Sequence, residues 1–125
     1  MVEVIPISFL QYQRASMRTA RKEELVAALV HASLGLASEA GEFTSEVKRM
    51  SAYSKVMSAE MKAHMLEELG DTLWYIALAC DALGADMGTV AFENVNKLRK
   101  RFPDKFTNDA AEARADKGGL SHTES

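Results

Sequence analysis

The chain has 125 residues, of which 47% are hydrophobic, so it has the length of one domain and enough apolar side chains for a core. Its formal net charge of −3 provides no basic field for gripping DNA or RNA, which disfavours binding to a nucleic acid polymer. The single cysteine, Cys80, excludes an intrachain disulfide, and its apolar neighbours indicate a small buried hydrophobe.

The chain carries no sign of export or of a membrane partner. Residues 1–10 lack the basic start and small-residue cleavage site of a signal peptide. No apolar run approaches the roughly 20 residues that a membrane span needs. We therefore expect a soluble, cytoplasmic protein.

Two helices are predicted in the first half of the chain. Ser8 and Gln11 form a capping-box pattern, which predicts a short helix over about residues 9–18. A long amphipathic helix follows over about residues 23–50, with apolar residues at helical spacing. Residues 51–57 are predicted to form a loop.

Two further helices complete an expected four-helix bundle. The third helix starts near Ser58 and stops at Gly84, and the fourth ends before Pro103. We expect residues 1–106 to form a single domain. Residues 107–125 are polar and are expected to be largely disordered.

The sharpest feature is a repeated spacing of acidic residues. Glu39 and Glu42 lie three apart in the second helix, and Glu68 and Asp71 lie three apart in the third. Residues three apart differ by about 60° around a helix, so each pair shares one face. Two antiparallel helices can therefore bring four carboxylates into one small volume.

The neighbours of the second acidic pair favour a metal site. Apolar side chains flank this pair on both sides of the helix: Leu69, Ile76 and Leu83 on one, Trp74, Leu78 and Ala82 on the other. Clustered, partly desolvated carboxylates repel one another unless a cation compensates. Oxygen ligands alone point to Mg²⁺ or Mn²⁺ over zinc or copper.

Two other interpretations of the acidic residues stay open. A ferritin-like di-iron bundle normally requires Glu-x-x-His on two helices, and the chain has no such motif. A non-catalytic helical interaction module would carry the same carboxylates on solvated faces. The apolar flanks of Glu68 and Asp71 weigh against that second interpretation.

Four segments resemble one known family. They are YQRASMRTA (12–20), LGLASEAGEF (34–43), EELGDTLWYIA (67–77) and NVNKLRKRFPDKF (94–106). In this combination they resemble the MazG-like nucleotide pyrophosphohydrolases of the all-α NTP pyrophosphatase superfamily. The resemblance implies long helices packed across the subunits of a homodimer or homotetramer, with active sites near the interfaces. It also implies hydrolysis of a nucleoside triphosphate to the monophosphate and pyrophosphate.

The resemblance also assigns roles by position. The implied Mg²⁺ ligands, with Mn²⁺ as a possible substitute, are Glu39, Glu42, Glu68 and Asp71. Lys97 and Arg101 become candidate phosphate contacts; the alternative is a solvated cationic helix end that complements the helix dipole.

The remaining candidates concern the attacking water and the base. We favour Glu42 over Glu39 as the carboxylate that takes the proton of the water. Tyr75, four residues after Asp71, is a candidate for stacking on a base, with core packing as the alternative. Asn94 is a candidate for reading the base or sugar, or for a local cap. Lys48 is a further phosphate candidate.

Overall fold

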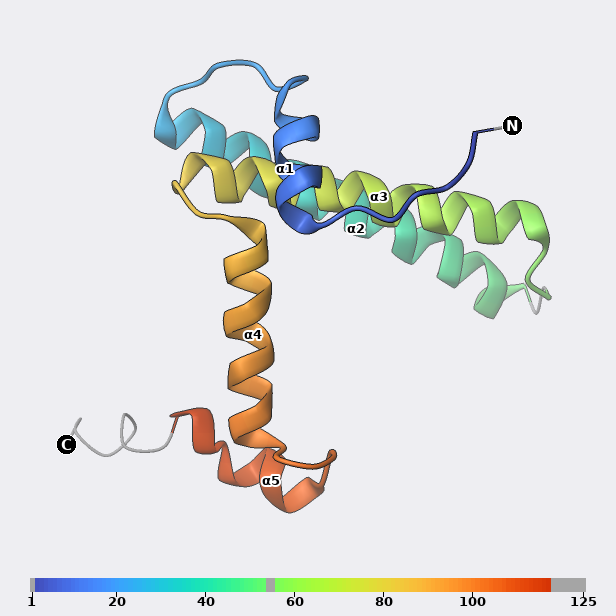
Figure 1. Cartoon of the computed structure of the whole chain (residues 1–125). Helices are drawn as coiled ribbons and strands as arrows, with labels where there is room; N and C mark the ends of the chain where they lie inside the picture. The colour runs from blue at the N-terminus through green and yellow to red at the C-terminus, as the bar shows by residue number, and fades with distance from the viewer. Residues whose placement is uncertain (1, 54–55, 118–125) are drawn as a thin grey trace. The chain divides into compact units, whose positions relative to one another are not determined.

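The computed structural model describes residues 2–53 and 56–117, and every regular element within them is helical (Figure 1). The elements are α1 (Phe9–Met17), α2 (Leu25–Ala52), α3 (Ala59–Ala82), α4 (Met87–Arg101), α5 (Asn108–Ala113) and a 3₁₀ turn, η1 (Ala115–Lys117). The predicted all-α class is confirmed. The chain divides into two compact units, Met1–Met87 and Gly88–Ser125, which are described separately below.

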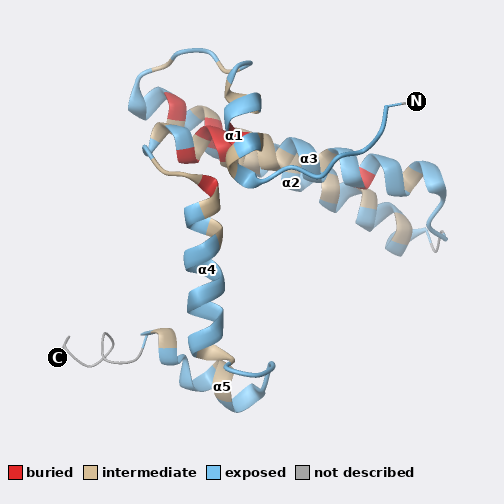
Figure 2. Ribbon diagram, viewed as in Figure 1, coloured by how far each residue is buried: buried red, intermediate tan, exposed pale blue. Residues whose placement is uncertain are grey.

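The first unit is built on an antiparallel pair formed by α2 and α3 (Figure 1). The buried residues of α2 are both alanines, Ala28 and Ala32, whose small side chains allow the two helix axes to approach closely. On α3 the buried set includes Met65 and Leu78 (Figure 2). Helix α1 packs against α3. The acidic residues of α2 and α3 are thus carried on two neighbouring helices.

The helix ends follow the local signals of the sequence. Ser8 and Gln11 form the predicted capping box, and Ser58 accepts from the backbone N–H of Met61 at 3.1 Å. Gly84 adopts a φ of 66°, the left-handed conformation that ends helices at little cost in glycine. The backbone N–H of Ala85 then reaches back to the carbonyl of Cys80 at 2.8 Å.

The structure differs from the predicted loop at residues 51–57, since α2 continues through Ala52. No proline or glycine stands there to stop the helix, and the backbone N–H of Tyr53 still bonds to the carbonyl of Arg49 at 3.2 Å. Residues 54 and 55 of the predicted loop lie outside the described residues.

The core of the first unit lies between α1 and α3. Ala77, Cys80 and Met87 are buried there, and Tyr12, Met17, Leu73, Ile76 and Ala85 pack against them. The prediction that Cys80 is a buried hydrophobe is confirmed. Burial and the charge of Asp86 raise the pKa of its thiol, which keeps the sulfur protonated and unreactive.

One buried polar side chain, Gln13, connects α1 to the turn after α3. Its Nε2 donates to the carbonyl of Ala85 at 2.9 Å, and its Oε1 accepts from the backbone N–H of Met87 at 2.8 Å. Both ends of the amide are therefore satisfied at a point where the backbone leaves one helix and enters the next.

The second unit shows structure in part of the predicted disordered tail. Thr107 caps α5 by accepting from the backbone N–H of Ala110 at 3.1 Å. Asp116 accepts from Nε and Nη2 of Arg101 at 2.9 and 3.0 Å, a two-pronged contact that ties η1 to α4. Residues 118–125 of the tail lie outside the described residues.

Many large apolar side chains remain exposed. On α2, Val26, Val30 and Leu34 follow one another at four-residue intervals and form a stripe with exposures of 73%, 51% and 66%. No single helix in the described part of the chain has the length and apolar composition to span a membrane. Only α3 and α4, taken together as a pair bent at the break between them, meet these two criteria.

Replacing Gln13 by alanine is expected to lower the free energy of unfolding by about 1–3 kcal/mol, because a buried backbone N–H and carbonyl lose their partners. Urea denaturation measures the change. Gln11→Ala is the matched control: Gln11 sits two residues earlier on the same helix, and water can replace its exposed bond to the Ser8 backbone. Equal losses in the two variants would contradict the structural role of Gln13.

Candidate metal and nucleotide site

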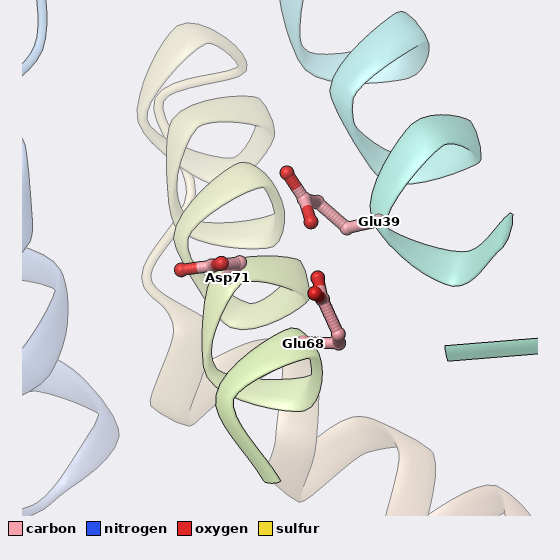
Figure 3. Close-up of side chains that lie close together, drawn as sticks. All are labelled: Glu39, Glu68 and Asp71. Atoms are coloured by element: carbon pink, nitrogen blue, oxygen red, sulfur yellow. The ribbon is translucent and has the colours of Figure 1, made fainter. Parts of the chain in front are cut away.

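Three of the four predicted acidic ligands come together between α2 and α3. One ligand oxygen from each of Glu39, Glu68 and Asp71 lies within 4.8 Å of the other two (Figure 3). Glu39 and Glu68 are half-buried, and Asp71 is exposed at the rim. A cluster of this size, made only of carboxylate oxygens, has the donor chemistry that hard divalent cations prefer.

The carboxylates of this acidic cluster lie close enough to one another to change their protonation. A hydrogen bond to Glu39 is the main cause that raises the pKa of Glu68 to about 7 from its ordinary 4.5. Partial burial adds to the increase, and so do the charges of Glu39, Glu42 and Asp71. Without a cation, this site therefore retains a proton that an isolated carboxylate would release.

Glu42, the fourth predicted ligand, stands apart from the cluster. It is exposed on α2, and its oxygens are not among the ligand atoms that converge. Its charge still contributes to the raised pKa of Glu68, so it lies near enough to act on the site. Glu46, one turn further along α2, forms an ion pair with Arg49 at 3.4 Å.

Two aromatic residues of α3 extend the acidic cluster into a pocket. A cavity of about 320 Å³ is lined by Glu39, Asp71, Trp74 and Tyr75. Tyr75 thus lies beside the carboxylates, as its spacing from Asp71 predicts. Carboxylates and aromatic rings on one pocket wall offer a place for a ligand that carries both a cation-bound group and a flat ring.

Sequence reasoning missed Trp74 as part of this pocket. The spacing places it about 100° away from Tyr75 around the helix, among the apolar flanks of the acidic pair. The indole is large, however, and its Nε1 donates to Oγ1 of Thr19 at 3.0 Å, which fixes its direction. The signal was present in the spacing: Trp74 follows Asp71 by three residues, the same interval as the acidic pairs.

Tyr12 of α1 is a second neighbour that the sequence did not single out. Its hydroxyl donates to the carbonyl of Gly70 at 3.5 Å. Burial, and then the charge of Asp71, raise the pKa of Tyr12, so the phenol stays protonated beside the acidic cluster. Helix α1 therefore covers one flank of the site.

The candidate contacts to phosphate, base and sugar, apart from Tyr75, are not among the residues that line this pocket. Lys48 is exposed on α2, and the pocket is lined by other residues. Asn94 and Lys97 are exposed on α4, in the second unit. Arg101 is half-buried against Asp116; that carboxylate raises the pKa of Arg101, and the guanidinium in turn lowers the pKa of Asp116.

Comparisons with known proteins identify the family of the chain. The family described as the MazG nucleotide pyrophosphohydrolase domain matches residues 29–106, which is more than half of the chain and includes all four predicted acidic ligands. The Gene 37 protein of Mycobacterium phage L5 is 35% identical over 74 residues. That alignment covers 58% of this chain and 65% of the phage protein, so the chain spans less than two thirds of the length of this relative. No solved structure matches the chain. The resemblance seen in the sequence is confirmed, and the chain belongs to the MazG nucleotide pyrophosphohydrolase family.

Proposed function

We propose that this protein hydrolyses nucleoside triphosphates, ribose or deoxyribose, to the monophosphate and pyrophosphate in a reaction that depends on Mg²⁺. The observation that carries the proposal is the convergence of Glu39, Glu68 and Asp71 within 4.8 Å, inside the segment that matches the family. The aromatic pocket that shares two of these residues supplies a place for the nucleoside.

The donor set fits a magnesium ion. All three converging groups are carboxylates, without a histidine or thiolate, and such sites suit Mg²⁺ or Mn²⁺. The raised pKa of Glu68 is the response of a carboxylate cluster that lacks positive charge. A bound cation would neutralise phosphate oxygens and lower the pKa of the attacking water.

The remaining acidic residue is suited to move a proton. Glu42 stands outside the converging oxygens, so its carboxylate stays available as a base while its charge still acts on Glu68. We assign Glu42 as the group that takes the proton of the attacking water. Glu39 has the second claim to that role, but its oxygen is already part of the cluster.

Cationic side chains would then hold the phosphates of the substrate. Lys97 and Arg101 lie four residues apart on α4 and share a face, which suits them to contact the departing pyrophosphate. Arg101 donates two hydrogen bonds to the carboxylate of Asp116, in the two-pronged geometry that a guanidinium also uses for phosphate. A two-pronged contact of phosphate with Nε and Nη2 of Arg101 would have to displace Asp116. Lys48 is a further candidate.

We place the nucleobase on the aromatic side of the site, and the lining of the pocket supports this placement. Tyr75 lies four residues after Asp71, about 6 Å along the helix, so a nucleotide with its phosphates at the carboxylates would carry its base toward the rings. Tyr75 would stack on the base, and Asn94 is the candidate for a polar contact to the base or sugar.

We further propose that the active form is a homodimer or homotetramer. The stripe of Val26, Val30 and Leu34 on α2 is exposed in the single chain, and no large side chain in the described residues is fully buried. Packing this stripe against a second copy would remove its apolar surface from water.

Pyrophosphate release from a panel of canonical and modified NTPs and dNTPs, with Mg²⁺ and with EDTA, tests the function. We expect release with Mg²⁺ only, and a loss of at least about 100-fold in Glu68→Gln, since even outer-shell changes at metal sites cost up to that much. Glu67→Gln is the matched control, because Glu67 is the exposed neighbour of Glu68 and lies outside the cluster. A folded wild type that releases no pyrophosphate from any triphosphate would instead favour an interaction module.

The variant Glu42→Gln tests whether Glu42 acts as the general base or as a metal ligand. We expect it to lose turnover, by about 100-fold or more for a general base, while Mg²⁺ still raises Tm. Glu39→Gln should lose both the turnover and the Tm shift. If Mg²⁺ no longer stabilises Glu42→Gln, Glu42 is a ligand and the assignment as base is wrong.

The raised pKa of Glu68 predicts how stability depends on pH without a cation. Between about pH 4.5 and 7 the folded protein retains a proton that the unfolded chain has released, so the free energy of unfolding falls as pH rises through this window. Mg²⁺ must displace that proton, so its effect on Tm should grow from about pH 5.5 to about pH 8. Glu68→Gln should flatten both trends, and Glu67→Gln should not; persistence of both trends in Glu68→Gln would contradict the assignment.

Light scattering after size exclusion tests the assembly. Val30→Glu places a charge in the centre of the exposed stripe and is expected to give monomers. Ala15→Glu, at an exposed position of α1, is the matched control and should leave the mass unchanged. An unchanged oligomer in Val30→Glu would show that this stripe is not the interface.

A further inference from the structure

The Tyr75 ring is held against the helix that faces it. A Cβ atom at residue 35 would overlap this ring, so the ring lies in the space that Gly35 leaves open. Glycine inside a helix costs about 1 kcal/mol relative to alanine. Gly35 sits within α2, one turn before Glu39. The close approach of an aromatic ring gives a physical reason for a glycine at this point.

Two further rings hold Tyr75 from the side. Trp74 meets it edge to face, with ring centroids 5.1 Å apart at 84°. His31 also meets it edge to face, at 5.8 Å and 71°. Such arrangements are favoured by the charge distribution of aromatic rings and restrict the rotation of each member.

His31 is itself fixed by a carboxylate from the segment before α2. Its Nδ1 donates to Oε1 of Glu23 at 2.8 Å, and only 16% of the Glu23 side chain is exposed. This bond also sets the tautomer and direction of the imidazole. Together with the bond from Trp74 to Thr19, it means that residues 19–23 hold both neighbours of Tyr75 in place.

We propose that Glu23, His31 and Gly35 are positioning residues that fix Tyr75 as a rigid wall of the nucleobase subsite and so set the base selectivity. This rests on the proposed function, since it assumes that the pocket beside Glu39 and Asp71 takes a nucleotide. A wall held in one orientation discriminates between bases by shape, whereas a ring free to turn adapts to each.

Gly35→Ala displaces the ring, and Gly41→Ala is its matched control: Gly41 lies in the same helix, and nothing lies within 4 Å of the Cβ it would gain. The probe is Trp74, the only tryptophan in the chain and part of the pocket wall. Its fluorescence is followed while AMP, GMP, CMP and UMP are added separately in the presence of Mg²⁺; a monophosphate has no phosphoanhydride bond to cleave, so binding is measured without hydrolysis.

We expect the wild type and Gly41→Ala to discriminate between the four bases. In Gly35→Ala and in His31→Ala, the ratio of Kd between the poorest and the best base should fall by about threefold or more, the factor expected when one side chain loses its pre-ordering. In the triphosphate assay, KM should change with the base while kcat changes little. Glu23→Gln should shift selectivity in the same direction by a smaller factor.

A double-mutant cycle with Tyr75→Ala separates positioning from a general structural role. If Gly35 acts through the Tyr75 ring, Gly35→Ala has no further effect on selectivity once that ring is absent. Equal losses for all bases, additive with Tyr75→Ala, would overturn the inference. So would a wild type whose Trp74 fluorescence responds to none of the four nucleotides. Pyrophosphate release by the wild type is scored independently, so the proposed function can stand while this inference fails.

Discussion

The pairing of α2 with α3 forces acidic side chains of the two helices into one small volume, and the rest of the site depends on that constraint. Glu39, Glu68 and Asp71 converge although like charges repel, and no lysine or arginine among the described residues forms an ion pair with them. A protein gains nothing in stability from such a cluster. A ligand that brings positive charge would offset this repulsion, which is why the cluster is a candidate functional site.

The packing of α2 also leaves apolar surface uncovered. The buried residues of α2 are alanines, and a stripe of larger apolar residues on that helix stays exposed. Specific hydrogen bonds and one ion pair supply part of the stability that a larger apolar core would supply. Gln13 closes the turn between α3 and α4, and Asp116 holds Arg101 within the second unit. Assembly with a second copy would complete the burial that one chain leaves unfinished.

The sequence predicted features whose causes are local or periodic. The capping box at Ser8 located α1, helical spacing of apolar residues located α2, and Ser58 and Gly84 marked the two ends of α3. The interval of three residues placed Glu68 and Asp71 on one face. These signals lie within a few residues of the structure they specify, so one sequence is enough to interpret them.

What the sequence did not predict depends on contacts across elements. The direction of Trp74 is set by Thr19, and that of His31 by Glu23, and neither partner is marked by spacing. The separation of Glu42 from the other carboxylates depends on how α2 is rotated against α3. The ordered turn after α4 depends on a bond from Arg101 across 15 residues.

The register of α2 against α3 connects the two halves of the site. Gly35 lies one turn from Glu39, and Tyr75 lies one turn from Asp71, so the contact between the glycine and the ring lies beside the acidic cluster on the same pair of helices. Advancing one helix by a single residue shifts it by about 1.5 Å and turns its side chains by about 100°. Such a slip would both separate the carboxylates and move the Tyr75 ring out of the space beside Gly35. The geometry that we assign to base recognition and the geometry that we assign to the cation therefore both depend on the register of α2 against α3.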